Sequence, residues 1–311
     1  MSAYGITAIG TYLPEQRIDN FDSRERFSVG REFIETKIGI RRKALKGKQE
    51  ATSDLAVRAV EHLLKKHHFD LAEVDIVVVV TQNPDRAIPH VSAIVHEKLD
   101  LLDHVICYDL SHGCAGFVYG FASLSSMMDT LHLRKGLLIT ADPYSMIVDP
   151  NDKNTSMLFG DGASATLVDS SGAYRAQSYD FGILPKSHQH LTVVSGKLHM
   201  DGRELFNFAA RSVPKSVSNV LDKANKNIDS VDRFIFHQGS KFLVDMLIRQ
   251  LRLPKDRVPF EATDYGNTVS SSIPIILAEE VDLKRSNSIL LCGFGVGLSW
   301  GTMLLTQSCD E

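Results

Sequence analysis

The sequence predicts an α/β fold built from two similar halves, and two observations lead to this prediction. Strand-like and helix-like runs alternate along the chain, and the order of these runs in the first half recurs in the second. Alternation of this kind is typical of sheets that are covered by helices. With 311 residues, of which 43% are hydrophobic, the chain is long and apolar enough for one large domain or two of ordinary size.

Local patterns predict the elements of the first half in order. The segment 4–13 predicts a strand closed by Pro14, and 23–37 has mixed helical character. Thr52-Ser53-Asp54 is typical of a helix N-terminus, and the residues that follow it are apolar along one face. The run 74–80 is continuous and β-branched, as in a strand covered on both faces. Further strands are expected over 104–110, 136–140 and 163–168, and further helices over 90–99 and 117–133.

The second half repeats the first at a nearly constant separation along the chain. Three pairs of segments match: Val74-Asp75 with Val231-Asp232, 105–116 with 258–269, and 135–140 with 287–292. Internal repeats decide the architecture of a fold, although α/β units also resemble one another by chance. We therefore predict a duplicated fold, with one half over residues 1–170 and the other over 171–311. In this fold Cys114 and Asn267 occupy matching helix starts.

The stretch 111–117, Ser-His-Gly-Cys-Ala-Gly-Phe, lies between a predicted strand and a predicted buried helix. It places Cys114 at a sharp turn directly before the helix. The unpaired N–H groups and the positive dipole end of a helix N-terminus stabilise a thiolate, which is the nucleophilic form of cysteine. The sequence therefore indicates a nucleophilic cysteine, with an inert buried cysteine as the alternative.

Two further polar residues occupy comparable positions. His237 follows the predicted strand 232–236, at the kind of strand end where catalytic groups collect in α/β sheets. Together with Cys114, His237 and Asn267 would provide a nucleophile, a proton-handling imidazole and a neutral hydrogen-bond donor. The glycines of 293–297 would let backbone N–H groups approach a substrate oxygen, as an oxyanion hole requires, with a plain hairpin as the alternative.

Composition argues against several classes of partner and site. The net charge of −4 gives no indication of binding to nucleic acid or to an anionic membrane surface. The start of the chain shows no secretory signal, and the apolar run 76–80 is far too short to span a membrane. The histidines lack partners at metal-ligand spacing, so we expect no metal. Four cysteines without C-x-x-C spacing indicate reduced thiols in a cytoplasmic protein: Cys107, Cys114, Cys292 and Cys309.

Taken together, several motifs resemble the thiolase superfamily, and most closely its β-ketoacyl-acyl-carrier-protein synthase III branch. The motifs are GCAGF at 113–117, LFGDGASA at 158–165, HQGS at 237–240, YGNT at 265–268 and GFGVGLSWG at 293–301. The likeness extends from about Tyr4 to Leu305. It implies a thiolase-like duplicated fold of five αβαβα layers, a homodimer and a Cys-His-Asn triad.

The resemblance also implies roles for individual residues. Cys114 matches the acyl-accepting nucleophile, and His237 and Asn267 match the pair that holds a malonyl thioester carbonyl. The backbone N–H groups of Cys114 and Val296 match the oxyanion hole. Four residues match the acyl pocket, one of which (Ile88) reaches into the pocket of the partner subunit: Gln82, Ile88, Phe159 and Phe294. Four match the entrance for coenzyme A or a carrier protein: Phe33, Lys37, Lys153 and Lys241.

The entrance and the acyl pocket depart from the family pattern. Phe33 and Lys153 stand where the family often uses Trp and Arg to hold the adenine of coenzyme A, and Lys37 replaces another Arg. Phe stacks with less area than Trp, and Lys does not bind phosphate bidentately. Gln82 replaces a smaller residue near the acyl pocket. These departures leave the acyl group and its donor open, and with them the choice between fatty acid biosynthesis and secondary metabolism.

The leading hypothesis is a condensing enzyme that takes an acyl group from an acyl-CoA or acyl-carrier-protein thioester onto Cys114. Decarboxylative Claisen condensation with a malonyl thioester on acyl carrier protein then extends this group, and the chemistry requires no metal or redox cofactor. One alternative is an acyltransferase of the same fold that passes the acyl group to a hydroxyl or an amine. Another is a non-catalytic acyl-binding partner subunit. Asn267 disfavours the first, because its donor is suited to stabilising an enolate, and the complete triad disfavours the second.

Overall fold

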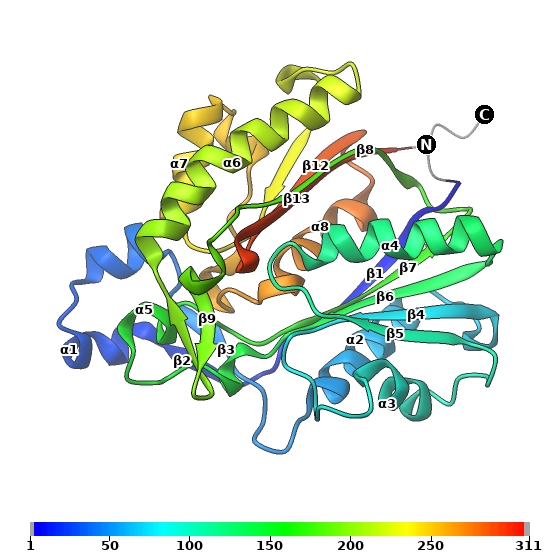
Figure 1. Cartoon of the computed structure of the whole chain (residues 1–311), viewed down its shortest axis with the longest axis horizontal. Helices are drawn as coiled ribbons and strands as arrows, with labels where there is room; N and C mark the ends of the chain where they lie inside the picture. Colours follow the sequence, from blue (N-terminus) through cyan, green and yellow to red (C-terminus); the bar gives the residue numbers. More distant parts are fainter. Residues whose placement is uncertain (1–2, 308–311) are drawn as a thin grey trace.

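Nine strands form one mixed sheet within residues 3–307, which the computed structural model describes (Figure 1). Cys309 lies outside the described residues. From edge to edge the strand order is β11-β12-β13-β8-β1-β7-β6-β4-β5. The strands are β1 (Gly5–Tyr12), β4 (Val74–Val80), β5 (Ile106–Leu110), β6 (Lys135–Ala141), β7 (Ala163–Asp169), β8 (Tyr174–Ile183), β11 (Arg233–Phe236), β12 (Ser288–Gly295) and β13 (Ser299–Gln307).

The two halves of the sheet run outward from its centre in matching order. β1 and β8 meet there through a short antiparallel pairing at Gly5–Arg175 and Ile6–Tyr174. From this junction β1 is followed by β7, β6, β4 and β5, and β8 by β13, β12 and β11. The pairs β4–β6 and β11–β12 are both parallel, whereas β6–β7 and β12–β13 are both antiparallel. The duplication predicted from the sequence is therefore visible in the strand order.

Helices complete the five layers of the thiolase-like fold. α2 (Thr52–Lys66) and α3 (Val91–Lys98) cover the first half of the sheet, α6 (Gly202–Lys223) covers the second half, and α7 (Lys241–Leu251) packs against α6. α4 (Gly116–Leu131) contacts β4 and β6 of the first half as well as β12 and β13 of the second. α8 (Ser272–Leu283) likewise contacts strands of both halves. Figure 1 shows α4 and α8 between the two covering layers.

The apolar character of α4 follows from this central position. Phe117, Phe121, Leu124 and Met128 are fully buried, because strands of both sheet halves pack around the helix. The first half of the helix, up to Ser125, has no exposed residue and is apolar on most faces, as a helix enclosed by other elements requires, whereas Ser126, Asp129, Thr130 and Leu131 near its end are exposed. The central layer thus holds the start of α4, and with it Cys114, deep inside the subunit.

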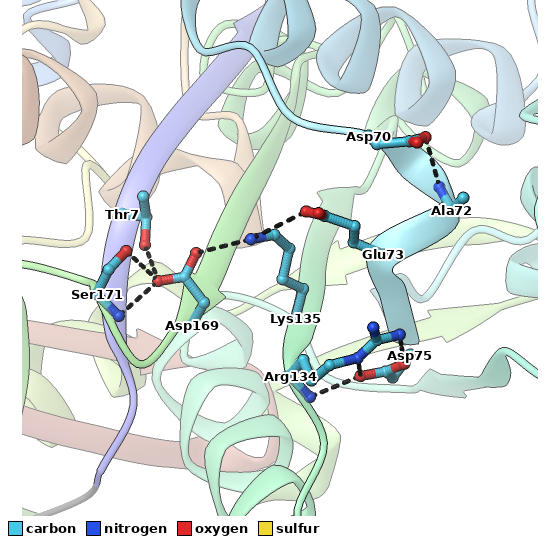
Figure 2. A network of polar contacts seen from close by, with 9 residues as sticks. All are labelled: Thr7, Asp70, Ala72, Glu73, Asp75, Arg134, Lys135, Asp169 and Ser171. Atoms are coloured by element: carbon cyan, nitrogen blue, oxygen red, sulfur yellow. Dashed lines mark hydrogen bonds and ion pairs between the residues drawn. The ribbon is translucent and has the colours of Figure 1, made fainter.

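One aspartate in each half fastens a pair of strands in the same way. The Asp75 carboxylate at the start of β4 accepts a hydrogen bond from the backbone N–H of Arg134 at 2.6 Å, and it also pairs with the guanidinium at 3.0 Å (Figure 2). In the second half, Asp232 accepts from the backbone N–H groups of Asn287 and Ser288 at 2.8 and 2.9 Å. The matching aspartates of the sequence repeat therefore have the same structural task.

A second set of contacts in Figure 2 joins β1, β6 and β7. The Lys135 ammonium lies 3.2 Å from Glu73 and 3.9 Å from Asp169. Asp169 in turn accepts hydrogen bonds from the hydroxyls of Thr7 and Ser171 at 2.8 and 2.6 Å. These contacts hold together the ends of neighbouring strands, and they lie away from the residues that the sequence predicts to be catalytic.

Three predicted elements differ from the structure. The expected strand in 258–269 is not formed, because Pro259 offers no amide hydrogen to a sheet, and β5 therefore has no counterpart among the described residues of the second half. The helical segment 23–37 is broken into α1 (Arg24–Phe27) and a π-helical turn (Phe33–Ile38). The N-cap of α2 is Ala51 rather than Thr52, and its N–H donates to the Asp54 carboxylate at 2.8 Å.

Shorter elements complete the fold. Two small two-stranded sheets, of which the second is a hairpin, and several single turns connect the larger elements. They comprise β2 (Arg17–Asp19) with β3 (Arg42–Ala44), β9 (Leu191–Val194) with β10 (Lys197–Met200), α5 (Lys153–Ser156), and 3-10 turns at Asn20–Ser23, Leu71–Glu73, Tyr144–Met146, His188–His190, Ile228–Ser230, Lys255–Arg257, Ala262–Asp264, Val269–Ser271 and Val296–Leu298. Among the helices of the described residues, none is both long and apolar enough to cross a bilayer.

Candidate active site

Cys114 lies between β5 and α4, as the sequence predicts, and is 3% exposed. The end of β12 packs directly against it. A Cβ atom built on Gly295 would lie 2.6 Å from the Cys114 sulfur, and one built on Gly293 would lie 2.5 Å from the Cys114 carbonyl oxygen. Both distances are far below van der Waals contact, so only glycine fits at these two positions. The Gly-rich segment is therefore part of the site rather than a plain hairpin.

His237 follows β11 and is held from three directions. Its backbone N–H donates to the Cys292 carbonyl at 2.9 Å, which continues the pairing of β11 with β12. The ring Nδ1 lies 2.8 Å from the Ser272 hydroxyl at the start of α8. The ring also meets Phe294 edge to face, with 5.7 Å between centroids. These contacts fix the plane of the imidazole and leave Nε2 as its reactive edge.

Asn267 is positioned by the turn that precedes α8. Its backbone pairs with the Leu158 carbonyl at 2.9 Å and with the Gly160 N–H at 3.0 Å. The side-chain oxygen accepts a hydrogen bond from the backbone N–H of Val269 at 2.9 Å. Because the oxygen is occupied in this way, the side chain presents its NH₂ group as a donor. Val269 adopts φ 53°, a conformation that a β-branched residue rarely adopts, and this strain sits at the site itself.

One cavity brings the three predicted triad residues together. Cys114, His237 and Asn267 all line a cavity of about 400 Å³, although they come from three segments far apart in the sequence. Phe159 and Phe294, two of the predicted acyl-pocket residues, line the same cavity. The rest of the wall is mostly apolar and includes Leu158, Leu191, Phe206, Phe208 and Leu243.

Burial makes the resting site neutral. Desolvation, together with the nearby Asp142 carboxylate, raises the pKa of the Cys114 thiol to about 12. Desolvation lowers the pKa of His237 to about 3, although a hydrogen bond to the backbone of Val269 acts in the opposite direction. The sequence predicts a thiolate stabilised by a helix start, but here burial outweighs that effect. Cys114 and His237 therefore form a thiol and a neutral imidazole at pH 7.

Two backbone amides face the sulfur. Hydrogen bonds from the N–H groups of Val296 and of Cys114 itself lower the pKa of the thiol, against the larger effect of burial. These are the two groups that the family resemblance implies as an oxyanion hole. An oxygen on a carbon bonded to the sulfur would lie within reach of the same donors.

The predicted entrance residues divide into two groups. Phe33, Lys37 and Lys153 line a hollow of about 620 Å³ that shares Phe242 and Arg203 with the catalytic cavity, so this hollow is the mouth of the site. The Lys37 ammonium lies 4.4 Å from the centre of the Phe242 ring, and the Lys153 ammonium lies 5.8 Å from that of Phe33.

Lys241 lies elsewhere, in a separate hollow, where it pairs with Asp245 at 2.8 Å. Successive residues of a helix point about 100° apart. For this reason the start of α7 turns Phe242 toward the mouth and Lys241 away from it. Phe242, which stands where the family uses a basic residue for docking of the carrier protein, lines the mouth, and so does Arg203, which was not predicted as a site residue. Arg203 belongs to no motif that would have indicated this position.

Two predicted acyl-pocket residues do not line the cavity of this subunit. The Ile88 side chain is 85% exposed, and it lies in the loop between β4 and α3. Gln82 lies behind the cavity wall, where its side-chain oxygen accepts a hydrogen bond from the Tyr144 hydroxyl at 2.8 Å. Sequence reasoning did not identify Tyr144, because the contact depends on the pairing of β4 with β6 rather than on any local motif.

Known families and relatives match this arrangement. Residues 108–183 match the family model described as 3-oxoacyl-[acyl-carrier-protein (ACP)] synthase III, and residues 221–307 match that of the C-terminal part. The chain is 34% identical over 305 residues to the β-ketoacyl-[acyl-carrier-protein] synthase III of Geobacillus kaustophilus, a match that covers 97% of this chain and 98% of that protein. The chain belongs to the β-ketoacyl-acyl-carrier-protein synthase III family.

Solved structures of the synthase III family have the same fold. The Thermus thermophilus synthase III superposes with a TM-score of 0.90 at 34% identity, covering 98% of this chain and 100% of that one. The Aquifex aeolicus enzyme superposes with a TM-score of 0.91 at 30% identity, covering 97% and 99%. The thiolase-like fold and the family predicted from the motifs are thus confirmed. The protein is a condensing enzyme of the ketosynthase III type.

Proposed function

We propose that this synthase III family member loads an acyl group on Cys114 and extends it by decarboxylative condensation with a malonyl thioester. The observation that carries the proposal is the single buried cavity shared by Cys114, His237 and Asn267, with the N–H groups of Cys114 and Val296 at the sulfur. A nucleophile, a proton acceptor, a neutral donor and an oxyanion hole are the groups that this reaction needs.

The first half-reaction transfers the acyl group. The Cys114 sulfur attacks the carbonyl carbon of an acyl thioester while His237 Nε2 takes up the thiol proton. The N–H groups of Cys114 and Val296 hold the oxygen of the tetrahedral intermediate. The bond to the departing sulfur then breaks, the proton passes to that thiolate, and the acyl group remains on Cys114 as a new thioester. A neutral thiol beside a neutral imidazole suits this sequence, because charge develops only once the substrate is bound.

The second half-reaction forms the carbon–carbon bond. The malonyl carboxylate leaves as carbon dioxide, and its bonding electrons pass into an enolate of the thioester. The side-chain NH₂ group of Asn267 and an N–H at Nε2 of neutral His237 donate to the enolate oxygen in the apolar cavity. The carbanion attacks the acyl carbonyl, the bond between the acyl carbon and the Cys114 sulfur breaks, and the thiolate takes up one proton from solvent. Every step is assigned to this chain's own groups, so the proposal involves no metal or redox cofactor.

The substrates follow from the mouth of the site and from the relatives. The names of the relatives specify an acyl carrier protein, and we propose that the malonyl thioester is carried by such a protein here as well. The acyl donor is an acyl-CoA or acyl-carrier-protein thioester. Three cationic side chains at the mouth, those of Lys37, Lys153 and Arg203, suit the phosphates that both donors carry.

We also propose that the enzyme is a homodimer in the cytoplasm. β5 is an edge strand of the sheet, and all five of its residues are only partly buried in the single subunit. An uncovered edge strand favours pairing with another chain. The exposed Ile88 is available to reach a second subunit. Cys107, Cys114 and Cys292 are free cysteines, which is consistent with a reducing compartment.

Mass spectrometry of the intact protein tests the proposed function. We expect an acyl adduct that is absent from Cys114→Ala, and we expect a β-ketoacyl product with release of carbon dioxide when a malonyl-carrier thioester is added. An adduct on Cys114 that no malonyl thioester extends would favour an acyltransferase. Absence of an adduct with every acyl-CoA and acyl-carrier donor would favour a non-catalytic acyl-binding protein.

A further inference from the structure

A second cavity lies against the catalytic one, on the other side of Phe159. It measures about 290 Å³, at the lower end of the range of about 300–1,000 Å³ that is usual for small-molecule sites. Residues between 18 and 45 form one part of its wall, and residues between 145 and 159 form the other. Of the described residues that line either cavity, Phe159 alone lines both. None of the triad residues lines the second cavity, so the proposed reaction leaves it without a task.

Lys43 on β3 contributes a buried amine to this wall. The residue is 8% exposed, and among the described residues its ammonium makes a single hydrogen bond, to the Ser156 carbonyl. An ammonium has three N–H donors, so two of them remain unused. Burial lowers the pKa of Lys43 to about 8, although the Asp161 carboxylate acts in the opposite direction. The amine is therefore still mostly protonated at pH 7.

The negative charge that acts on Lys43 is engaged by other groups. Asp161 is fully buried, and it accepts hydrogen bonds from the Ser145 hydroxyl at 2.6 Å and from the backbone N–H of Lys46 at 2.9 Å. Lys43 and Asp161 do not form an ion pair with each other. A buried charge without a direct partner is costly, so Lys43 would gain from an anion that a ligand supplies.

Ser156 adds an unused hydroxyl to the same wall. The hydroxyl is buried and has no hydrogen-bond partner among the described residues. Buried polar groups normally have a partner, so this one also favours a ligand with an acceptor. Among the described residues that line the cavity, none is acidic. The remaining wall is mostly apolar and consists chiefly of Ile18, Phe27, Leu45, Val148, Met157 and Phe159.

We propose that this second cavity binds a small monocarboxylate with an apolar body. The carboxylate accepts hydrogen bonds from the Lys43 ammonium and the Ser156 hydroxyl, and the apolar body lies against Met157 and Phe159. One buried cation and one hydroxyl match a single negative charge, whereas a phosphate group would bring almost two charges and about three acceptor oxygens. The inference goes beyond the proposed function, because no step of the condensation uses this cavity.

The test is a titration of the full-length protein with hexanoate at pH 7, followed by NMR of isotope-labelled methionine methyl groups. Met157 lines the second cavity and Met200 lines the catalytic cavity, so their two signals distinguish the sites. Hexanoate should shift the Met157 signal saturably. Hexanamide has the same apolar body without the charge, and it should bind at Met157 about 10-fold or more weakly.

Two variants remove the donors one at a time. Lys43→Leu should weaken the binding of hexanoate by about 10-fold or more, and Ser156→Ala by about threefold or more. Ser156→Ala removes a single oxygen atom, so it tests the site even if Lys43→Leu fails to fold. Lys37→Leu is the matched control, because it removes a lysine from the mouth of the catalytic cavity and should leave the affinity at Met157 unchanged.

Three results would overturn the inference. The first is a Met157 signal that hexanoate does not shift, including a shift of Met200 alone, which would place the ligand in the catalytic cavity. The second is equal binding of hexanoate and hexanamide at Met157. The third is parental affinity for hexanoate in the folded donor variants. Acylation of Cys114 is measured in none of these experiments, so their failure would leave the proposed function intact.

Discussion

At the scale of single residues, Asn267 and Cys114 serve different half-reactions of the proposed mechanism. Acylation needs the Cys114 sulfur and the two backbone donors, whereas condensation needs the enolate to be held by Asn267 and His237. We therefore expect Asn267→Ala to accept an acyl group and to lose malonyl decarboxylation and condensation, by about 10²–10³-fold for one preorganised donor. Cys114→Ala should lose acylation and keep decarboxylation, because both enolate donors remain.

The two half-reactions are measured separately, by adduct mass and by release of carbon dioxide. Parental condensation by Asn267→Ala would mean that Asn267 is only structural. The hydrogen bond from the Val269 backbone N–H to the Asn267 side chain allows a second test of whether Asn267 is only structural. If Asn267 merely held the strained turn, the variant would lose stability and acylation together, rather than condensation alone.

The proton on Cys114 gives a second prediction at this scale. With the pKa of the thiol raised to about 12 by burial and by Asp142, the thiolate is scarce at pH 7 and rises tenfold with each pH unit below that pKa. Alkylation of Cys114 by iodoacetamide, followed by peptide mass spectrometry, should therefore be slow at pH 7 and still rise above pH 9. Half-maximal alkylation below pH 8 would instead indicate a resting ion pair with His237.

The variant Asp142→Asn separates the effect of the Asp142 charge on the pKa of Cys114 from the effect of burial. The variant removes a nearby negative charge, which lowers the pKa of Cys114, and alkylation at pH 9 should be faster than in the parent. Burial raises the pKa of Asp142 itself to about 7, so the parental carboxylate becomes protonated below that pH. Below pH 7 the alkylation rates of the variant and the parent should therefore become more similar. Cys107 is monitored in the same digest as an internal control.

At the scale of elements, the end of β12 decides whether Cys114 keeps its position. Gly295→Ala places a methyl group 2.6 Å from the sulfur, and overpacking of this kind typically costs about 1–3 kcal/mol. Because the strain falls on the nucleophile and on the adjacent Val296 amide, we expect adduct formation to fall by about 10²-fold or more. Gly30→Ala is the matched control, since nothing lies within 4 Å of its new methyl group. Equal adduct rates for both variants would show that the close approach is unimportant.

Local sequence patterns predict the residues of the triad, but they do not predict contacts that depend on how the elements pack. Cys114 and His237 were predictable because one precedes a helix and the other follows a strand, and Asn267 because it lies in a motif that matches the Cys114 segment of the repeat, although the structure places it in a turn before α8. The partnership of Gln82 with Tyr144 was not, because 62 residues separate them and only the pairing of β4 with β6 brings them together. Similarly, the rotation of α7 decides which neighbour faces the mouth, and no motif specifies that rotation.

At the scale of the whole molecule, the uncovered edge of the sheet favours a dimer. β5 is the edge strand of the first half, and the loop that carries Ile88 connects β4 to α3, the helix packed on β5. The Ile88 side chain is 85% exposed in the single subunit, an unusual position for a large apolar residue near a predicted pocket. A twofold contact along β5 would cover the edge and bring each Ile88 to the partner subunit. Because β5 is the edge strand, a dimer through β5 would extend the same sheet across the twofold axis.

Complementation between two variants tests this arrangement. Ile88→Asp should acylate poorly, because it places a charge in the pocket of the partner subunit, and Cys114→Ala should not acylate at all. Co-expressed, the two chains form mixed dimers in which an intact Cys114 is served by an intact Ile88, so roughly a quarter of all sites should regain the parental rate. Sedimentation should show a stable dimer throughout. A fully active monomer, or co-expressed chains no more active than Ile88→Asp alone, would rule out a pocket shared between subunits.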